Sequence, residues 1–269
     1  MKIYCMNRIA LNDICIMLNE IYGQNPKFDN YLILVDLNGL KYDLIKKFKE
    51  QGYYLVRYDL DHIIGNDWYF KTCEDRLSVN KIDSMCDEIW TYSLENKEYL
   101  QSLGFNVKFR PILYSNNLKS NNIYLNPNPP IDVLFYGNLT QRRYKLFEKL
   151  QNEKQGMFSF DYIHAIPKHV MDWKISNSKI ILNCKADDKH YNQEICRIFY
   201  PLINNKCVLS EKSNCDEYAG DNIAYFTWDN VTQTILQLLQ NNNYKEFENK
   251  GMSYKRLCES GDLYHTSEV

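Results

Sequence analysis

Short apolar runs alternate with amphipathic segments along most of this chain of 269 residues. YLILVDLN (31–38) and YYLVRYDLD (53–61) have the length and composition of buried strands, and YDLIKKFKEQG (42–52) between them spaces its apolar residues as a helix does. Repeated strand-then-helix order predicts a parallel sheet with helices on both faces. The order continues through an expected helix at 94–104 and strand at 106–113, so the first part of the chain is expected to be α/β.

A polar, proline-tipped stretch, YSNNLKSNNIYLNPNPP (114–130), interrupts this order and predicts a linker over 116–130, because proline and asparagine clusters break both helix and strand. The order then restarts, with strands expected at 131–137, 158–164, 179–185, 207–211 and 223–228 and helices at 142–151, 167–178, 194–205 and 231–240. We expect α/β domains at 1–115 and 131–240 and a C-terminal helical tail at 241–269. Two such Rossmann-like domains would face each other across a cleft, where ligands of open α/β sheets bind.

Composition and charge limit the partners of such a chain. The net charge of −2 gives no electrostatic basis for binding nucleic acid or an anionic membrane. The nine cysteines include no CxxC pair, which is typical of free thiols in a reducing compartment. The N-terminal stretch MKIYCMNRIALND lacks a signal-peptide core, and no apolar stretch approaches the roughly 20 residues that span a bilayer. We therefore expect a cytoplasmic protein without an integral membrane segment.

The stretch YGNLTQRR (136–143) stands where an expected strand gives way to an expected helix. A helix N-terminus offers unpaired backbone N–H groups to a phosphate, and a glycine lets the ligand approach the backbone. Arg142 and Arg143 would add forked donors, which suit a diphosphate. Gly137, Asn138, Arg142 and Arg143 are therefore candidate phosphate-binding residues. The stretch has neither the GxGxxG nor the GxxxxGK[ST] spacing, so an ordinary turn with two solvated arginines is the alternative.

Three segments of the second half resemble the donor-binding domain of GT-B-type, nucleotide-sugar-dependent glycosyltransferases: DVLFYGNLTQRR (132–143), KIILNCK (179–185) and EICRIFYPLINNKCVLSE (194–211). Members of that family commonly show an apolar strand, a glycine loop with paired arginines and an LN strand end. A glutamate and an arginine then open a helix that leads to a V-x-SE segment. The chain looks most like the short bacterial and large-DNA-virus members related to the spore-coat CgeB-like group. The resemblance implies the GT-B fold and a role in glycan biosynthesis.

The first half adds VRYDLDHI (56–63), IWTYSLENKEYL (89–100) and FRPILYS (109–115), which resemble the family's Y-x-x-E-Q, W-x-Y-S-x-x-N and P-I segments. Two departures from the family pattern stand out. Asp61 and His62 occupy the positions of the family's Glu and Gln. Cys184 and Lys185 follow Asn183 where a histidine often occurs nearby.

A sugar nucleotide needs hydrogen-bond donors for its phosphates and acceptors for its hydroxyls. Glu194, at the start of the expected helix 194–205, can accept from ribose or sugar hydroxyls, and Arg197 one turn later faces the same side. The alternatives are a charge favoured by the helix dipole and a structural ion pair. The resemblance adds Asn183, while Ser210 and Glu211 end the strand 207–211, where a solvated turn is the alternative. We expect all five residues to bind the donor.

Glycosyl transfer with inversion needs a base that removes the acceptor proton. GT-B enzymes usually take that base from the N-terminal domain. This makes Asp61 and His62, at the end of the strand 53–61, the candidate catalytic residues, with Asp36 next. The expected donor is a nucleoside diphosphate sugar and the expected acceptor a hydroxyl of a glycan or glycoconjugate, with no metal ion or other cofactor.

Two other functions stay open at this point. DLD (59–61) matches the DxD pattern with which GT-A-type glycosyltransferases hold Mn²⁺ or Mg²⁺ against the donor, here through Asp59 and Asp61. The second alternative is a non-catalytic carbohydrate-binding or partner-binding module of the same fold, since Asp61 and His62 replace the family's residues.

Overall fold

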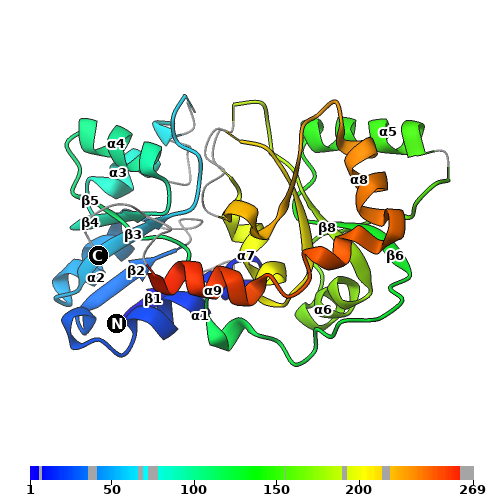
Figure 1. Cartoon of the computed structure of the whole chain (residues 1–269). Coiled ribbons are helices and arrows are strands. Elements are labelled where there is room, and N and C mark those ends of the chain that lie inside the picture. Colours follow the sequence, from blue (N-terminus) through cyan, green and yellow to red (C-terminus); the bar gives the residue numbers. More distant parts are fainter. Residues whose placement is uncertain are drawn as a thin grey trace. The chain divides into compact units, whose positions relative to one another are not determined.

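The computed structural model describes residues 1–5, 8–35, 41–65, 69–71, 78–154, 156–189, 193–213 and 219–260. The chain divides into two compact units, the first comprising Met1–Ser115 and the second beginning at Asn116 (Figure 1). Each unit contains one five-stranded parallel sheet with helices between the strands, which confirms the predicted α/β class.

The sheet of the first unit follows the order of the chain, β1-β2-β3-β4-β5, and every neighbouring pair is parallel. Its strands are β1 (Lys2–Tyr4), β2 (Tyr31–Leu34), β3 (Tyr54–Asp59), β4 (Glu88–Thr91) and β5 (Val107–Phe109). Its helices are α1 (Arg8–Tyr22), α2 (Tyr42–Glu50), α3 (Val79–Asp83) and α4 (Leu94–Ser102), with a 3₁₀ turn at Pro26–Phe28. The elements β2, α2, β3, α4 and β5 lie in segments where the sequence predicts them.

The core of the first unit contains an aliphatic group and a separate aromatic group. Ile45 of α2 and Ile82 of α3 pack against buried leucines of β2 and β3. A separate aromatic group surrounds the fully buried Trp90 of β4, with the rings of Tyr22 and Phe28 at 5.0 and 5.6 Å. Aromatic pairs at such distances add roughly 0.5–1.5 kcal/mol each beyond the burial of their area.

The sheet of the second unit has the order β10-β9-β8-β6-β7 and is also parallel throughout. Its strands are β6 (Ile131–Tyr136), β7 (Phe160–Ile163), β8 (Ser178–Asn183), β9 (Cys207–Glu211) and β10 (Ala224–Phe226). Its helices are α5 (Gln141–Lys154), α6 (Lys168–Ser176), α7 (Ile195–Ile203), α8 (Val231–Leu239) and α9 (Gly251–Ser260).

Alternate residues of these strands face two different helix layers. Val133, Phe135 and Leu182 belong to a core shared with apolar residues of α5 and α8. The intervening residues face the other side, where α7 contacts β8 and β9. Helix α7 is buried along most of its length because α9 packs against it (Figure 1). Helix α9 lies within the tail that the sequence predicts to be helical.

The stretch 116–130, predicted as a linker, is fastened to the second unit by side-chain amides and hydroxyls. The Asn204 side chain accepts from Ser120 N at 2.8 Å and donates to Leu118 O at 3.0 Å. Tyr124 N donates to Ser176 Oγ at 3.2 Å. The backbone of this stretch is therefore held against α6 and the end of α7, and the stretch belongs to the second unit.

No described helix is both long and apolar enough to cross a bilayer. The described cysteines are all free thiols.

Candidate functional site

The second sheet has a topological switch point between β6 and β8, because β6 leads through α5 to β7 on its other side. Ligands of open α/β sheets bind at the carboxyl ends of the strands at such a point. The loops that follow β6 and β8 meet here, where the Thr140 hydroxyl donates to the Ala186 carbonyl oxygen. The stretch YGNLTQRR thus lies where this sheet is expected to bind a ligand.

Gly137 gives the loop after β6 a conformation that other residues rarely adopt, with φ of +136°. Its N–H donates to Ile163 O at 3.1 Å. A Cβ atom at this position would lie 3.0 Å from Nε of Arg197. The glycine is therefore required both by the backbone and by the arginine side chain that lies against it.

Arg143 is buried, with a side chain 1% exposed. Its guanidinium donates to Asn138 O at 2.8 Å, twice to Cys184 O at 3.1 and 3.0 Å, and to Glu194 Oε1 at 2.7 Å. Burial lowers the pKa of Arg143, and the pairing with Glu194 opposes this shift. Arg143 thus joins the loops after β6 and β8 to the start of α7. Direct binding of a diphosphate by Arg143 stays a prediction.

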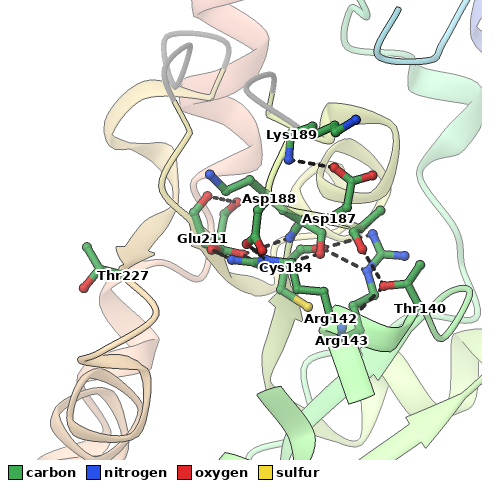
Figure 2. A network of polar contacts seen from close by, with 12 residues as sticks. Thr140, Arg142, Arg143, Cys184, Asp187, Asp188, Lys189, Glu211 and Thr227 are labelled. Atoms are coloured by element: carbon green, nitrogen blue, oxygen red, sulfur yellow. Dashed lines mark hydrogen bonds and ion pairs between the residues drawn. The ribbon is translucent and has the colours of Figure 1, made fainter. Parts of the chain in front are cut away.

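Arg142 forms a second ion-pair group, which Figure 2 shows beside the first. Its two terminal nitrogens donate to the two carboxylate oxygens of Glu211, one at 2.8 Å, and its Nε donates to Asp188. Burial opposes the charged form of Arg142, but the hydrogen bonds to Glu211 and Asp188 outweigh burial and raise its pKa. The guanidinium also lies 4.6 Å from the ring centre of Trp228. Glu211 is 5% exposed, whereas Asp188 is 88% exposed.

Glu194 lies between two arginines at the start of α7. One carboxylate oxygen pairs with Arg143 and the other with Arg197. The Tyr136 hydroxyl donates to the Arg197 carbonyl oxygen, which ties α7 to the end of β6. Arg197 is 25% exposed, so it is the more accessible of the two arginines on Glu194.

The charges of this cluster balance in the protein alone. Its ion pairs join three arginines to three carboxylates, Arg142, Arg143 and Arg197 to Asp188, Glu194 and Glu211. A diphosphate would therefore have to compete with a carboxylate for an arginine. The exposed Asp188 is the carboxylate that can leave at the lowest desolvation cost, because it is already in water.

Asn183 and Ser210 lie next to each other at the carboxyl ends of β8 and β9, beside this cluster. They are paired across β8 and β9, and Asn183 Nδ2 donates to Ser210 Oγ at 3.0 Å. Both side chains are buried. The structure thus brings the predicted donor-site residues of the second half together at one edge of the sheet, although their binding of a donor stays a prediction.

In the first unit, Asn96 holds the turn that follows β3. Its Nδ2 donates to Asp59 Oδ2 at 2.8 Å and to Asp61 O at 2.6 Å, and its Oδ1 accepts from Ile63 N at 3.4 Å. The VRYDLDHI segment and the asparagine of IWTYSLENKEYL are therefore parts of one structure. Asp61 is exposed, and a carboxylate there can accept a proton from a substrate, whereas His62 is buried.

Asp59 belongs to a buried ion-pair network. Its carboxylate accepts from Arg57 Nη1 at 2.8 Å and from Thr91 Oγ1 at 3.2 Å, and Arg57 also pairs with Asp83. The side chain of Asp59 is 0% exposed. A DxD site needs both carboxylates on the metal, so this arrangement argues against the Asp59 and Asp61 alternative. The described residues include no group of three or more His, Cys, Asp or Glu that could hold a metal ion.

Sequence reasoning missed several members of the cluster. Thr140 caps α5 by accepting from Arg143 N at 3.4 Å, and its position before a helical pattern was a usable signal. Asp188 follows the predicted strand 179–185, and Trp228 ends the predicted strand 223–228, where polar or aromatic side chains can reach a ligand. Gln193 precedes Glu194 and gave no signal of its own. The third base candidate, Asp36, lies outside the described residues.

Comparisons with known proteins support the fold. No protein-family model matches the chain, and no curated protein matches it in sequence. Sucrose-phosphate synthase from Thermosynechococcus elongatus aligns with a TM-score of 0.51 at 11% identity, over 87% of this chain and 73% of the synthase. Trehalose-6-phosphate synthase from E. coli, bound with UDP-2-fluoro glucose, gives 0.48 at 10% identity, over 88% of this chain and 71% of its own. An Arabidopsis thaliana UGT complexed with UDP-L-rhamnose gives 0.39 at 10% identity, with coverages of 95% and 75%. The chain has the α/β fold with two parallel sheets that matches sucrose-phosphate synthase, a GT-B glycosyltransferase.

Proposed function

We propose that this chain is a glycosyltransferase that moves a sugar from a nucleoside diphosphate sugar to a hydroxyl of a glycan or glycoconjugate. The observation that carries the proposal is the arginine cluster at the switch point of the second sheet. Arg142 and Arg197 are partly exposed there, beside the N-terminus of α7. The fold shared with sucrose-phosphate synthase supports the same reaction class.

The donor diphosphate would bind Arg142, Arg197 and the N–H groups at the start of α7. Forked guanidinium donors and a helix N-terminus both favour phosphate oxygens. If the diphosphate displaced Asp188, then Arg142 and Arg197 would supply positive charge to it, and this site would need no metal ion. Arg143 would act mainly by holding Glu194 and the loop carbonyls in place, since its guanidinium donates to these protein groups.

In the transfer step the acceptor oxygen attacks the anomeric carbon, the bond to the phosphate oxygen breaks, and the nucleoside diphosphate leaves. The proton of the acceptor hydroxyl goes to a base, for which we propose Asp61. It is the exposed carboxylate in the turn after β3. His62, buried next to it, would position that turn. The narrower likeness to the CgeB-like group stays a prediction.

The direct test is to incubate the protein with UDP-glucose, GDP-mannose and dTDP-glucose and to measure release of the nucleoside diphosphate. We expect at least one donor to be consumed, with the same rate in EDTA. Asp61→Asn should lower turnover by roughly 10²- to 10⁴-fold, the usual contribution of a positioned base, and leave the Kd of the donor nearly unchanged.

Asp43→Asn is the matched control, because Asp43 is an exposed carboxylate of the same unit in the first turn of α2. It should keep wild-type turnover. If Asp61→Asn instead weakens donor binding together with Mn²⁺ or Mg²⁺ binding, the metal-dependent alternative is correct. If no donor is consumed or bound, the protein is not a glycosyltransferase for these sugar nucleotides and the proposal falls.

A further inference from the structure

Two buried amide oxygens at the carboxyl end of the second sheet, Asn183 Oδ1 and Gln193 Oε1, have no hydrogen-bond partner within the described structure. The Asn183 side chain is 4% exposed and that of Gln193 is 1% exposed. An unpaired buried acceptor is unfavourable for a fold, and natural proteins keep few of them. These two oxygens therefore point to a group that the protein alone does not supply.

Two similar hydrogen-bond relays determine which way the amides face. Asn183 Nδ2 donates to Ser210 Oγ at 3.0 Å, and that hydroxyl donates to Glu211 O at 3.3 Å. Gln193 Nε2 donates to the Tyr225 hydroxyl at 3.2 Å, and that hydroxyl donates to Gly220 O at 3.2 Å. Each hydroxyl uses its one proton on a backbone carbonyl, so it must accept from the amide nitrogen. The amide oxygen is left as an acceptor without a partner in both relays.

The strand register places the two relays in one row. Asn183 of β8 is level with Ser210 of β9, which is level with Tyr225 of β10. In each of these strands the preceding residue faces α5 and α8; these residues are Leu182, Leu209 and Ala224. The row therefore faces the α7 side of the sheet.

Gln193 also connects this row to the charged cluster. It immediately precedes Glu194, and its carbonyl oxygen accepts from Ile195 N at 2.8 Å at the start of α7. Glu194 is 13% exposed and pairs with Arg197, which is 25% exposed. If Arg197 binds the diphosphate of a sugar nucleotide, the groups next to the diphosphate would lie close to Gln193.

We propose that Asn183 and Gln193, placed by the two relays at the end of the sheet, accept hydrogen bonds from hydroxyl groups of the bound sugar nucleotide. This inference rests on the function proposed above. Amide oxygens cannot bind ionised phosphate, because both are acceptors, so their ligand must carry donors. Hydroxyl donors occur both on the transferred sugar and on the ribose.

The test is calorimetric titration of wild type, Gln193→Met and Asn183→Leu with UDP, UDP-glucose, GDP and GDP-mannose. We expect each variant to bind the sugar nucleotide roughly 3- to 10-fold more weakly, the usual effect of one neutral hydrogen bond. A loss seen with UDP-glucose but not UDP assigns the amide to the sugar. An equal loss with both assigns it to the ribose. In the ligand-free protein Gln193→Met should keep or raise the melting temperature, because it removes an unpaired acceptor.

Asn204→Leu is the matched control at the other end of α7. Asn204 is also buried, but its amide donates to Leu118 O and Tyr200 O and accepts from Ser120 N. This control should lower the melting temperature and leave affinity unchanged. If wild type binds and both test variants bind equally well, the oxygens are satisfied by buried water and this inference is wrong, while the proposed function stands. If wild type binds none of the four probes, the proposed function fails first.

Discussion

Replacing Arg143 with methionine should strongly destabilise the second unit even without a ligand. The arginine makes four hydrogen bonds to three partners from different segments, Asn138 O, Cys184 O and Glu194 Oε1. Breaking a buried ion pair by removing one partner costs about 3–5 kcal/mol. The pair that Glu194 keeps with Arg197 reduces the loss, and the unpaired carbonyl of Cys184 adds to it. We expect a net loss of about 3–5 kcal/mol in the free energy of unfolding.

Urea denaturation followed by circular dichroism measures this change, and thermal melting gives a second estimate. For a unit of this size each kcal/mol lowers Tm by about 2–4 °C, so the shift should be roughly 6–20 °C. Lys149→Met is the matched control, because Lys149 is also on α5 but forms a half-exposed ion pair with Glu153. Such a pair contributes about 0.3–0.5 kcal/mol. A loss below about 1 kcal/mol for Arg143→Met would contradict this structural role.

Three further changes test other parts of the account. Gly137→Ala should destabilise the loop by about 1–3 kcal/mol, because the backbone φ at this position is +136°. It should also weaken nucleotide binding, because the new Cβ would displace Arg197. An unchanged melting temperature and an unchanged nucleotide affinity would contradict this. Asp188→Asn should strengthen binding of a nucleoside diphosphate in calorimetry, because it frees Arg142 from a competing carboxylate, and weaker binding would refute the competition. Burial raises the pKa of Asp83 from 3.8 to about 6, so the folded protein binds a proton that the unfolded chain has lost. The stability of the first unit should therefore fall as pH rises from 4 to 6, and Asp83→Asn should flatten this profile in urea titrations.

The two sheets could be predicted from the sequence because their central strands are continuous apolar runs. IDVLFY and SKIILN became β6 and β8, and both are buried on two sides. The strand β1, KIY, is three residues long, too short for any period to show. The stretch 116–130 was predicted to be a linker because its prolines and asparagines break both helix and strand. Its backbone contacts are with side chains distant in sequence, such as those of Ser176 and Asn204, which no local pattern indicates.

The candidate site was predictable in its location but not in its contacts. A glycine and two arginines after a strand indicated the loop at the switch point. The different burial of Arg143 and Arg142 depends on partners that are distant in sequence. Cys184 and Glu194 lie 41 and 51 residues from Arg143, and Glu211 lies 69 residues from Arg142. The unpaired oxygen of Gln193 likewise depends on Tyr225, 32 residues away. Partners at such separations are determined by strand order, which local sequence patterns do not specify.

The central claim is that a sugar nucleotide binds at the carboxyl edge of the second sheet. Hydrogen exchange with and without a saturating donor, read by mass spectrometry, tests this directly in the full chain. We expect slower exchange at residues 137–143, 184–189 and 193–197, with the same result in EDTA. Slower exchange confined to residues 59–63, dependent on Mn²⁺ or Mg²⁺, would contradict it and would place the donor on the first unit.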